Sequence, residues 1–272
     1  MAQNSASPAL RKAYADSLFG QMHYRYAGNP QADTEPLLCL HASPLSGIVY
    51  DRWLEEIGKD RFAIAPDTPG YGGSDAPDAP PLINDLADAM ISFLDSLQLQ
   101  TVDVIGYHTG SLIAADLAIR YPDRIRKVVM ISAPIFDQSI VDEYANRIYA
   151  ASPEFAAVLE SMALGLRSDG RGMFRDTSND RYEDVCIERL RNFRTENWGF
   201  RAAFAYDLTE ALPQLEQTIL ILNPEDDLWE MTPRAEAFLR NGRIHNLPGW
   251  THGHLDSHTG EMAEIVRRFL AE

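Results

Sequence analysis

The sequence predicts an α/β protein whose mostly parallel sheet carries helices on both faces. Short apolar or β-branched runs alternate with amphipathic helical stretches in the first half of the chain, a pattern typical of parallel sheets. The run 102–105 leads through Gly106 and Gly110 into a small-residue helix, so a strand, a sharp turn and a helix follow one another. A strand pattern returns at 218–222 after a long helical interval. These observations place the chain among the α/β proteins.

Eight stretches have the length and composition of strands. In the second of them, Met22, Tyr24 and Tyr26 alternate with polar residues, as in an antiparallel strand with one solvated face. The later stretches are nearly continuous apolar runs, which predicts that they are buried on both faces of the sheet. The eight stretches are 15–20, 21–26, 36–40, 62–65, 102–105, 127–132, 218–222 and 243–247.

Helical periodicity accounts for most of the remaining chain. An apolar stripe at helical spacing runs from Ile83 to Leu97, with aspartates on the opposite side. From Ala133 to about Gln217 the apolar spacing is helical throughout, and no strand pattern interrupts it. We therefore expect a core domain made of 1–134 and 217–272, with a helical insertion, 135–216, placed after the sixth strand.

Composition and charge exclude several classes of function. The 272 residues carry a net charge of −16, which would repel a phosphate backbone, so nucleic-acid binding is excluded. The two cysteines, Cys39 and Cys186, lie in apolar runs and are expected to be buried free thiols. Residues 1–11 lack the apolar core of a signal peptide, and no apolar run reaches the ~20 residues that span a bilayer. We therefore expect a soluble, cytoplasmic protein with no membrane partner.

The turn at 106–110 reads Gly-Tyr-His-Thr-Gly, which matches the nucleophile elbow Gly-x-Ser-x-Gly in all but its central residue. Glycines flank such a turn because it is strained and a Cβ would collide with neighbouring backbone. The central residue is raised where both the substrate and the helix N-terminus can reach it. Here that residue is His108, so an imidazole stands where the pattern expects a hydroxyl.

Four motifs, taken in order and spacing, resemble those of the α/β-hydrolase fold. His41–Pro44 is similar to the His-Gly-x-Pro loop of that family, and Asp67–Ser74 is similar to its Asp-x-Pro-Gly-x-Gly-x-Ser loop. The elbow follows, then an acidic loop at Glu225–Asp227 and a late histidine, His252. The resemblance extends from about residue 14 to the end of the chain, and is strongest to capped esterases, carbon–carbon hydrolases, epoxide hydrolases and dehalogenases. It implies an eight-stranded sheet and a helical cap formed by the insertion.

The resemblance also implies a catalytic dyad. His252 stands where the family has its general base, and Asp226 stands where the family acid orients the imidazole and stabilises its charged form. Asp227 and Glu225 are neighbours that could fill the acid role instead. We take Asp226 as the acid because the family acid usually lies at that distance from its strand.

Further site residues follow from the same resemblance. The backbone N–H groups of Ser43 and Thr109 would form the oxyanion hole, and neither donor depends on the identity of residue 108. Thr109 also opens a helix, whose positive end favours an anion. Tyr107, Trp198 and Phe204 are the candidate substrate contacts, although cap aromatics more often form the cap's own core.

Several roles are open for His108. A neutral imidazole with a pKa near ~6.5 can take a proton from water or from a substrate. Histidine can also act as a covalent nucleophile, although an acyl-imidazole hydrolyses quickly. A third reading is a pocket that binds a ligand without turnover, with His108 as a bulky polar residue on its floor. A fourth is that the histidine replaces a natural serine by design.

The remaining histidines are expected to have structural roles. His254 and His258 follow His252 closely, but the carboxylates of a zinc site are only loosely placed, so a solvated or capping role is favoured over a metal. His41 is expected to hydrogen-bond within its own loop. We therefore expect no metal and no organic cofactor.

The sequence thus predicts a hydrolase acting on a small, partly apolar ester-like or carbonyl substrate. One alternative is a cofactor-free lyase or decarboxylase that transfers protons between substrate, His108 and His252. The other is a ligand-binding homologue without catalysis. The small-molecule substrate is the only partner expected, and a homodimer is a common state for such folds.

Overall fold

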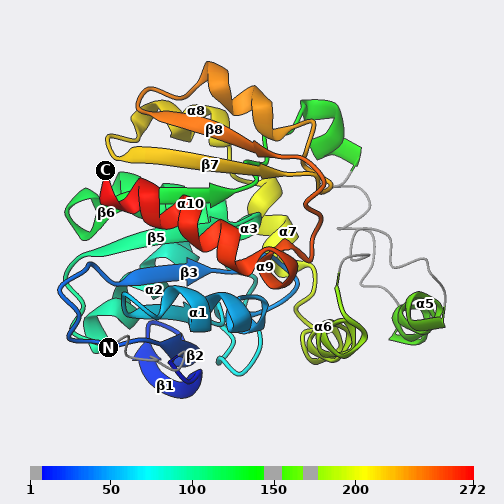
Figure 1. The fold of residues 1–272 in the computed structure, drawn as a ribbon. Coiled ribbons are helices and arrows are strands. Elements are labelled where there is room, and N and C mark those ends of the chain that lie inside the picture. Colours follow the sequence, from blue (N-terminus) through cyan, green and yellow to red (C-terminus); the bar gives the residue numbers. More distant parts are fainter. Residues whose placement is uncertain (1–7, 144–154, 168–176) are drawn as a thin grey trace.

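A computed structural model describes residues 8–143, 155–167 and 177–272. Its centre is an eight-stranded sheet in the order β1-β2-β4-β3-β5-β6-β7-β8 (Figure 1). β2 runs antiparallel to β1 and β4, and every other pairing is parallel. This confirms the predicted fold class. The strands are β1 (Arg11–Ser17), β2 (Gly20–Ala27), β3 (Leu37–Leu40), β4 (Ala63–Pro66), β5 (Val102–Tyr107), β6 (Ile125–Ile131), β7 (Thr218–Pro224) and β8 (Gly242–Leu247).

Helices cover both faces of the sheet, and each face has its own apolar core. The alternation along β5 divides them: Val102 and Val104 belong to one core, and Ile105 belongs to the other. On the first face lie α2 (Ile83–Ser96) and α3 (Thr109–Arg120). On the second face lie α1 (Asp51–Ile57) and α10 (Thr259–Ala271), which pack against each other (Figure 1). Both faces are therefore covered, as a parallel sheet with nearly continuous apolar strands requires.

The helical insertion lies between β6 and β7 in the chain. Its described helices are α5 (Phe155–Arg167), α6 (Asn179–Arg191), α7 (Trp198–Phe204) and α8 (Leu208–Ala211), and its described residues contain no strand. α5 and α6 share a small core of Val158, Met162 and Cys186, and they lie well away from the sheet (Figure 1). α7 and α8 instead pack on α3. That this insertion acts as a cap stays a prediction.

The cysteines and helices agree with two further expectations. Cys39 and Cys186 are both buried and free, as their apolar surroundings indicate. No helix in the described parts of the chain is both long enough and apolar enough to cross a membrane.

Asp67 holds together the loops that follow β3 and β4. Its buried carboxylate accepts hydrogen bonds from the backbone N–H groups of Gly47 and Gly73, each at 2.9 Å. It also binds Nδ1 of His23 at 2.7 Å and the Arg25 guanidinium at 3.1 Å. Burial opposes ionisation of Asp67, but His23 and Arg25 outweigh it and lower the pKa of this carboxyl. The loops at the carboxyl edge of the sheet are thus tied to one charged group.

His41 joins the same loops from inside the core. Its Nδ1 lies 3.0 Å from the carbonyl oxygen of Ala42, and its Nε2 accepts the backbone N–H of Thr68 at 2.9 Å. The predicted bond within its own loop is therefore present, together with a second bond that the sequence did not indicate. Burial lowers the pKa of His41 more than the nearby Asp67 carboxylate raises it.

We expect His41 to make the fold sensitive to acid. The unfolded chain binds a proton at this residue below its ordinary pKa of about 6.5, and the folded chain resists it, so stability falls with decreasing pH by up to ~1.4 kcal/mol per unit. In His41→Gln the acid-side loss of unfolding free energy should be shallower, as measured by urea unfolding between pH 7.5 and 5. The exposed His245→Gln serves as the matched control and should keep the wild-type slope, whereas an unchanged slope in His41→Gln would contradict the assignment.

Candidate active site

His108 occupies a strained turn between β5 and α3. Its φ is 49° and its ψ is −109°, a conformation that residues with a side chain rarely adopt. Its backbone N–H donates to Ile131 O at 3.0 Å, and its carbonyl accepts Ser111 N–H at 2.8 Å. A Cβ on Gly106 would lie 2.1 Å from the carbonyl oxygen of Gly110, so the turn closes only with glycine there. The elbow predicted from the sequence is therefore present, with histidine at its tip.

Asp226 binds the elbow histidine. Its Oδ2 lies 2.8 Å from Nε2 of His108, and this side chain of Asp226 is fully buried at the end of β7. Two further donors orient the carboxylate: the hydroxyl of Ser132 at 2.7 Å and the backbone N–H of Leu228 at 2.8 Å. Among the described residues, Nδ1 of His108 has no hydrogen-bonding partner. The two atoms of the imidazole are thus in different environments, one tied to an acid and one not.

His252 is paired with the neighbouring acid, Asp227. Nε2 of His252 lies 2.9 Å from Oδ1 of Asp227, and Nδ1 lies 2.6 Å from the hydroxyl of Tyr107. The predicted dyad of His252 with Asp226 is therefore wrong in its acid. Adjacent residues of one loop point their carboxylates at different histidines, and Asp226 turns toward His108 because Ser132 and the Leu228 N–H hold it there.

The charges of these groups follow from their neighbours. Burial alone would lower the pKa of His108, but the charge and hydrogen bond of Asp226 outweigh it, so this pKa is raised. Burial likewise opposes ionisation of Asp226 and Asp227, yet the adjacent histidines lower the pKa of both carboxyls. Burial and the two carboxylates raise the pKa of Tyr107 well above its ordinary value, so its phenol keeps its proton.

His108, Asp226, Asp227 and His252 together make a compact group, called here the four-residue centre. One nitrogen or oxygen of each residue lies within 4.8 Å of the corresponding atoms of the other three. The imidazole rings of His108 and His252 have centroids 5.3 Å apart. Two nitrogens and two carboxylate oxygens therefore converge on one small volume.

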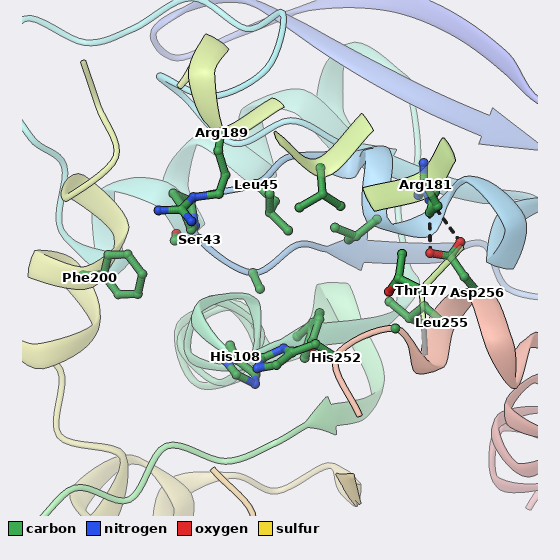
Figure 2. A pocket seen from close by; sticks show the side chains of 16 residues that line it. Ser43, Leu45, His108, Thr177, Arg181, Arg189, Phe200, His252, Leu255 and Asp256 are labelled. Atoms are coloured by element: carbon green, nitrogen blue, oxygen red, sulfur yellow. Dashed lines mark hydrogen bonds and ion pairs between the residues drawn. The ribbon is translucent and has the colours of Figure 1, made fainter. Parts of the chain in front are cut away.

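A cavity of about 220 Å³ opens over this centre. His108 and His252 lie side by side on one wall, and residues of the insertion lie across from them (Figure 2). Its walls combine core loops with α6 and α7, and they are formed by Ala42, Ser43, Pro44, Leu45, Val49, Tyr107, His108, Thr177, Arg181, Val185, Arg189, Phe200, His252, Gly253, Leu255 and Asp256. The size and the many apolar walls fit a small, partly apolar ligand.

The predicted aromatic contacts are only partly right. Tyr107 lines the cavity, but Trp198 and Phe204 do not belong to its walls. Trp198 instead packs against the loop at Gly70, and Phe204 packs against Phe136 at a centroid distance of 4.7 Å. Phe200 takes their place in the wall. The helical turn of α7 decides this, because residues two apart on a helix do not share a face.

Three cavity residues on α6 were missed, although a sequence signal exists. Arg181, Val185 and Arg189 are spaced four apart and therefore share one helix face. Both arginines are already paired: Arg181 binds Asp256 at 3.1 Å, and Arg189 binds Glu196 at 2.5 Å (Figure 2). Their charges are thus largely offset, which keeps the cavity from being strongly cationic.

The predicted oxyanion donors lie beside the centre. Ser43 lines the cavity, and Thr109 follows His108 as the first residue of α3. A helix leaves its first N–H groups without acceptors inside the helix, so the Thr109 N–H has no partner within α3. The role of these two groups stays a prediction.

His254 differs from its prediction. It is fully buried, so a solvated role is wrong for this residue; its Nδ1 donates to the carbonyl of Thr251 at 2.8 Å. Burial lowers the pKa of His254 to about 4, so it stays neutral. His258 stacks on Trp250, with ring centroids 4.3 Å apart.

Comparison with known proteins gives one family and several relatives. Residues 37–265 match the model of the alpha/beta hydrolase family. The chain is 25% identical over 251 residues to the 2-hydroxymuconate semialdehyde hydrolase of Pseudomonas sp. (strain CF600), covering 87% of each chain. It is 37% identical over 230 residues to a poly(3-hydroxyalkanoate) depolymerase of Ectopseudomonas oleovorans, covering 81% of this chain and 78% of that one.

Solved structures agree on the fold. The enol-lactonase from Burkholderia xenovorans LB400 superposes with a TM-score of 0.78 at 20% identity, covering 96% of this chain and 100% of that one. At this identity the similarity concerns the arrangement of strands and helices.

Proposed function

The chain is an enzyme of the alpha/beta hydrolase family, and on that premise we propose that it hydrolyses a small, partly apolar ester-like or carbonyl substrate by direct attack of water. The observation that carries this proposal is the 2.8 Å bond between Nε2 of His108 and Asp226. The elbow side chain is engaged by an acid instead of being presented to His252 as a free nucleophile. Both curated relatives compared above are hydrolases by name, one acting on a semialdehyde and one on a polyester.

Covalent attack by His108 itself is disfavoured by the geometry. Nε2 is occupied by Asp226, and Nδ1 adjoins the ring carbon that carries the main chain, where an acyl group would be crowded. His252 has both nitrogens engaged, by Asp227 and by Tyr107, so it offers no free base to a nucleophile at residue 108. A water molecule activated at the four-residue centre avoids both restrictions.

The cavity supports the expected substrate class. Its walls are mostly apolar, and their charged arginines are paired with acids. The attacked carbonyl would lie between the centre and the N–H groups of Ser43 and Thr109, which would stabilise the oxyanion. The oxyanion would then collapse and expel the alcohol or carbon leaving group.

The test is turnover of short activated esters by wild type, His108→Ala and His108→Ser. We expect wild type to turn over, the alanine variant to lose on the order of a hundredfold or more in kcat/KM, and serine not to restore it. Mass spectra of the quenched wild-type reaction should show no acyl adduct on the chain. An inactive wild type beside an active, acylated His108→Ser would overturn the proposal, because it would show an ordinary serine mechanism with the serine missing.

A further inference from the structure

We propose that the four-residue centre binds a divalent transition-metal ion, with Zn²⁺ as the representative cation. This departs from the expectation of no metal. Two imidazole nitrogens and two carboxylate oxygens form a mixed ligand set that zinc and similar cations accept. As far as it concerns hydrolysis the inference rests on the proposed function; the binding of the cation itself does not.

The spacing of the ligand atoms fits one cation between them. In a tetrahedral site with metal–ligand bonds of 2.0–2.1 Å, ligand atoms lie about 3.4 Å apart. The measured separations are 2.8 Å between His108 and Asp226, 3.7 Å between His108 and Asp227, and 2.9 Å between His252 and Asp227. These values lie on both sides of the tetrahedral one, so shifts of a few tenths of an ångström would complete the site.

Outer contacts hold the ligands in place. The Tyr107 hydroxyl lies on Nδ1 of His252, and when Nε2 binds a cation it can accept the proton that Nδ1 then carries. The Ser132 hydroxyl and the Leu228 N–H fix the buried carboxylate of Asp226. Metal-binding histidines and carboxylates commonly have such partners, and removing one typically weakens binding 10–100-fold.

The position of the centre indicates what the cation would do. His108 and His252 face the cavity, and Asp227 is the most exposed ligand, with 48% of its side chain accessible. A cation here would stand between the protein and the cavity, and a fifth ligand could be water. Cation-bound water ionises near neutral pH, which would supply hydroxide for the proposed attack.

The test is direct binding of Zn²⁺ to the full chain. Tag-free protein is freed of metal with a chelator, dialysed, and titrated with ZnCl₂ by calorimetry. We expect one Zn²⁺ per chain, binding weakened at least about a hundredfold in His252→Ala and in Asp226→Asn, and weakened about tenfold in Tyr107→Phe. The exposed His245→Gln is the matched control for adventitious histidine binding and should bind as wild type does. Thermal unfolding of each variant without metal shows whether it is folded.

The outcomes separate the two proposals. No binding by wild type, or equal binding by the folded ligand variants, overturns the cation site, and ester turnover by the metal-free enzyme would then leave the proposed function in place. Stoichiometric binding that is lost in the ligand variants supports the site. If such a zinc-loaded enzyme turned over no ester, the site would stand and the proposed function would fail.

Discussion

Asp226→Asn should lower kcat/KM on an activated ester on the order of a thousandfold, with a much smaller change in KM. The carboxylate is buried, holds Nε2 of His108 at 2.8 Å, and is itself fixed by Ser132 and by the Leu228 N–H. An amide of the same shape removes the negative charge and presents an N–H₂ donor to one of these donors. The reaction should therefore lose the group that orients His108 while the cavity above it stays intact.

Two variants on the same loop control this expectation. Asp227→Asn removes the more exposed carboxylate that faces His252, and we expect a smaller loss, about ten- to a hundredfold. Glu230→Gln changes an exposed carboxylate outside the site and should keep wild-type rates. Steady-state kinetics on one ester measure all three. If Asp227→Asn were the more damaging variant and Asp226→Asn nearly active, the acid would belong to His252, as the sequence alone had indicated.

Gly106→Ala should destabilise the fold by about 4 kcal/mol or more, a large part of the 5–15 kcal/mol that a typical domain has. A Cβ at this position would lie 2.1 Å from the carbonyl oxygen of Gly110 and 2.5 Å from the backbone nitrogen of Ser111. Neither backbone atom can move without opening the turn that carries His108. We expect a fall in Tm of about 10 °C or more, or failure to recover soluble protein.

Gly260→Ala is the matched control, since it makes the same chemical change at a position with space. No atom lies within 4 Å of the added Cβ, and the residue lies in the first turn of α10. Alanine is the better helix former by up to ~1 kcal/mol, so its Tm should be unchanged or slightly raised. A Gly106→Ala protein with the stability of Gly260→Ala would show that the elbow is not closed as described.

The sequence on its own was sufficient for the fold and for the place of the site. Strand, turn and helix signals are local, and the apolar runs at 102–105 and 218–222 did become neighbours of β6 in a parallel sheet. The glycines on either side of His108 predicted the elbow, because the requirement for a missing Cβ arises within five residues of chain. Local chemistry could therefore name His108, His252 and the acidic loop.

Which acid meets which histidine was decided only by tertiary structure. Asp226 and Asp227 are adjacent and chemically identical, so nothing in their order distinguishes them. The choice is made by Ser132, which follows β6 and donates to Asp226 from a neighbouring strand end, and by Tyr107, which directs His252 toward Asp227. The cavity walls likewise depend on how α6 and α7 rotate over the core, which admits Phe200 and leaves Trp198 and Phe204 outside. Partners that come together from distant parts of the chain are set by packing and register, which residue spacing in the sequence does not encode.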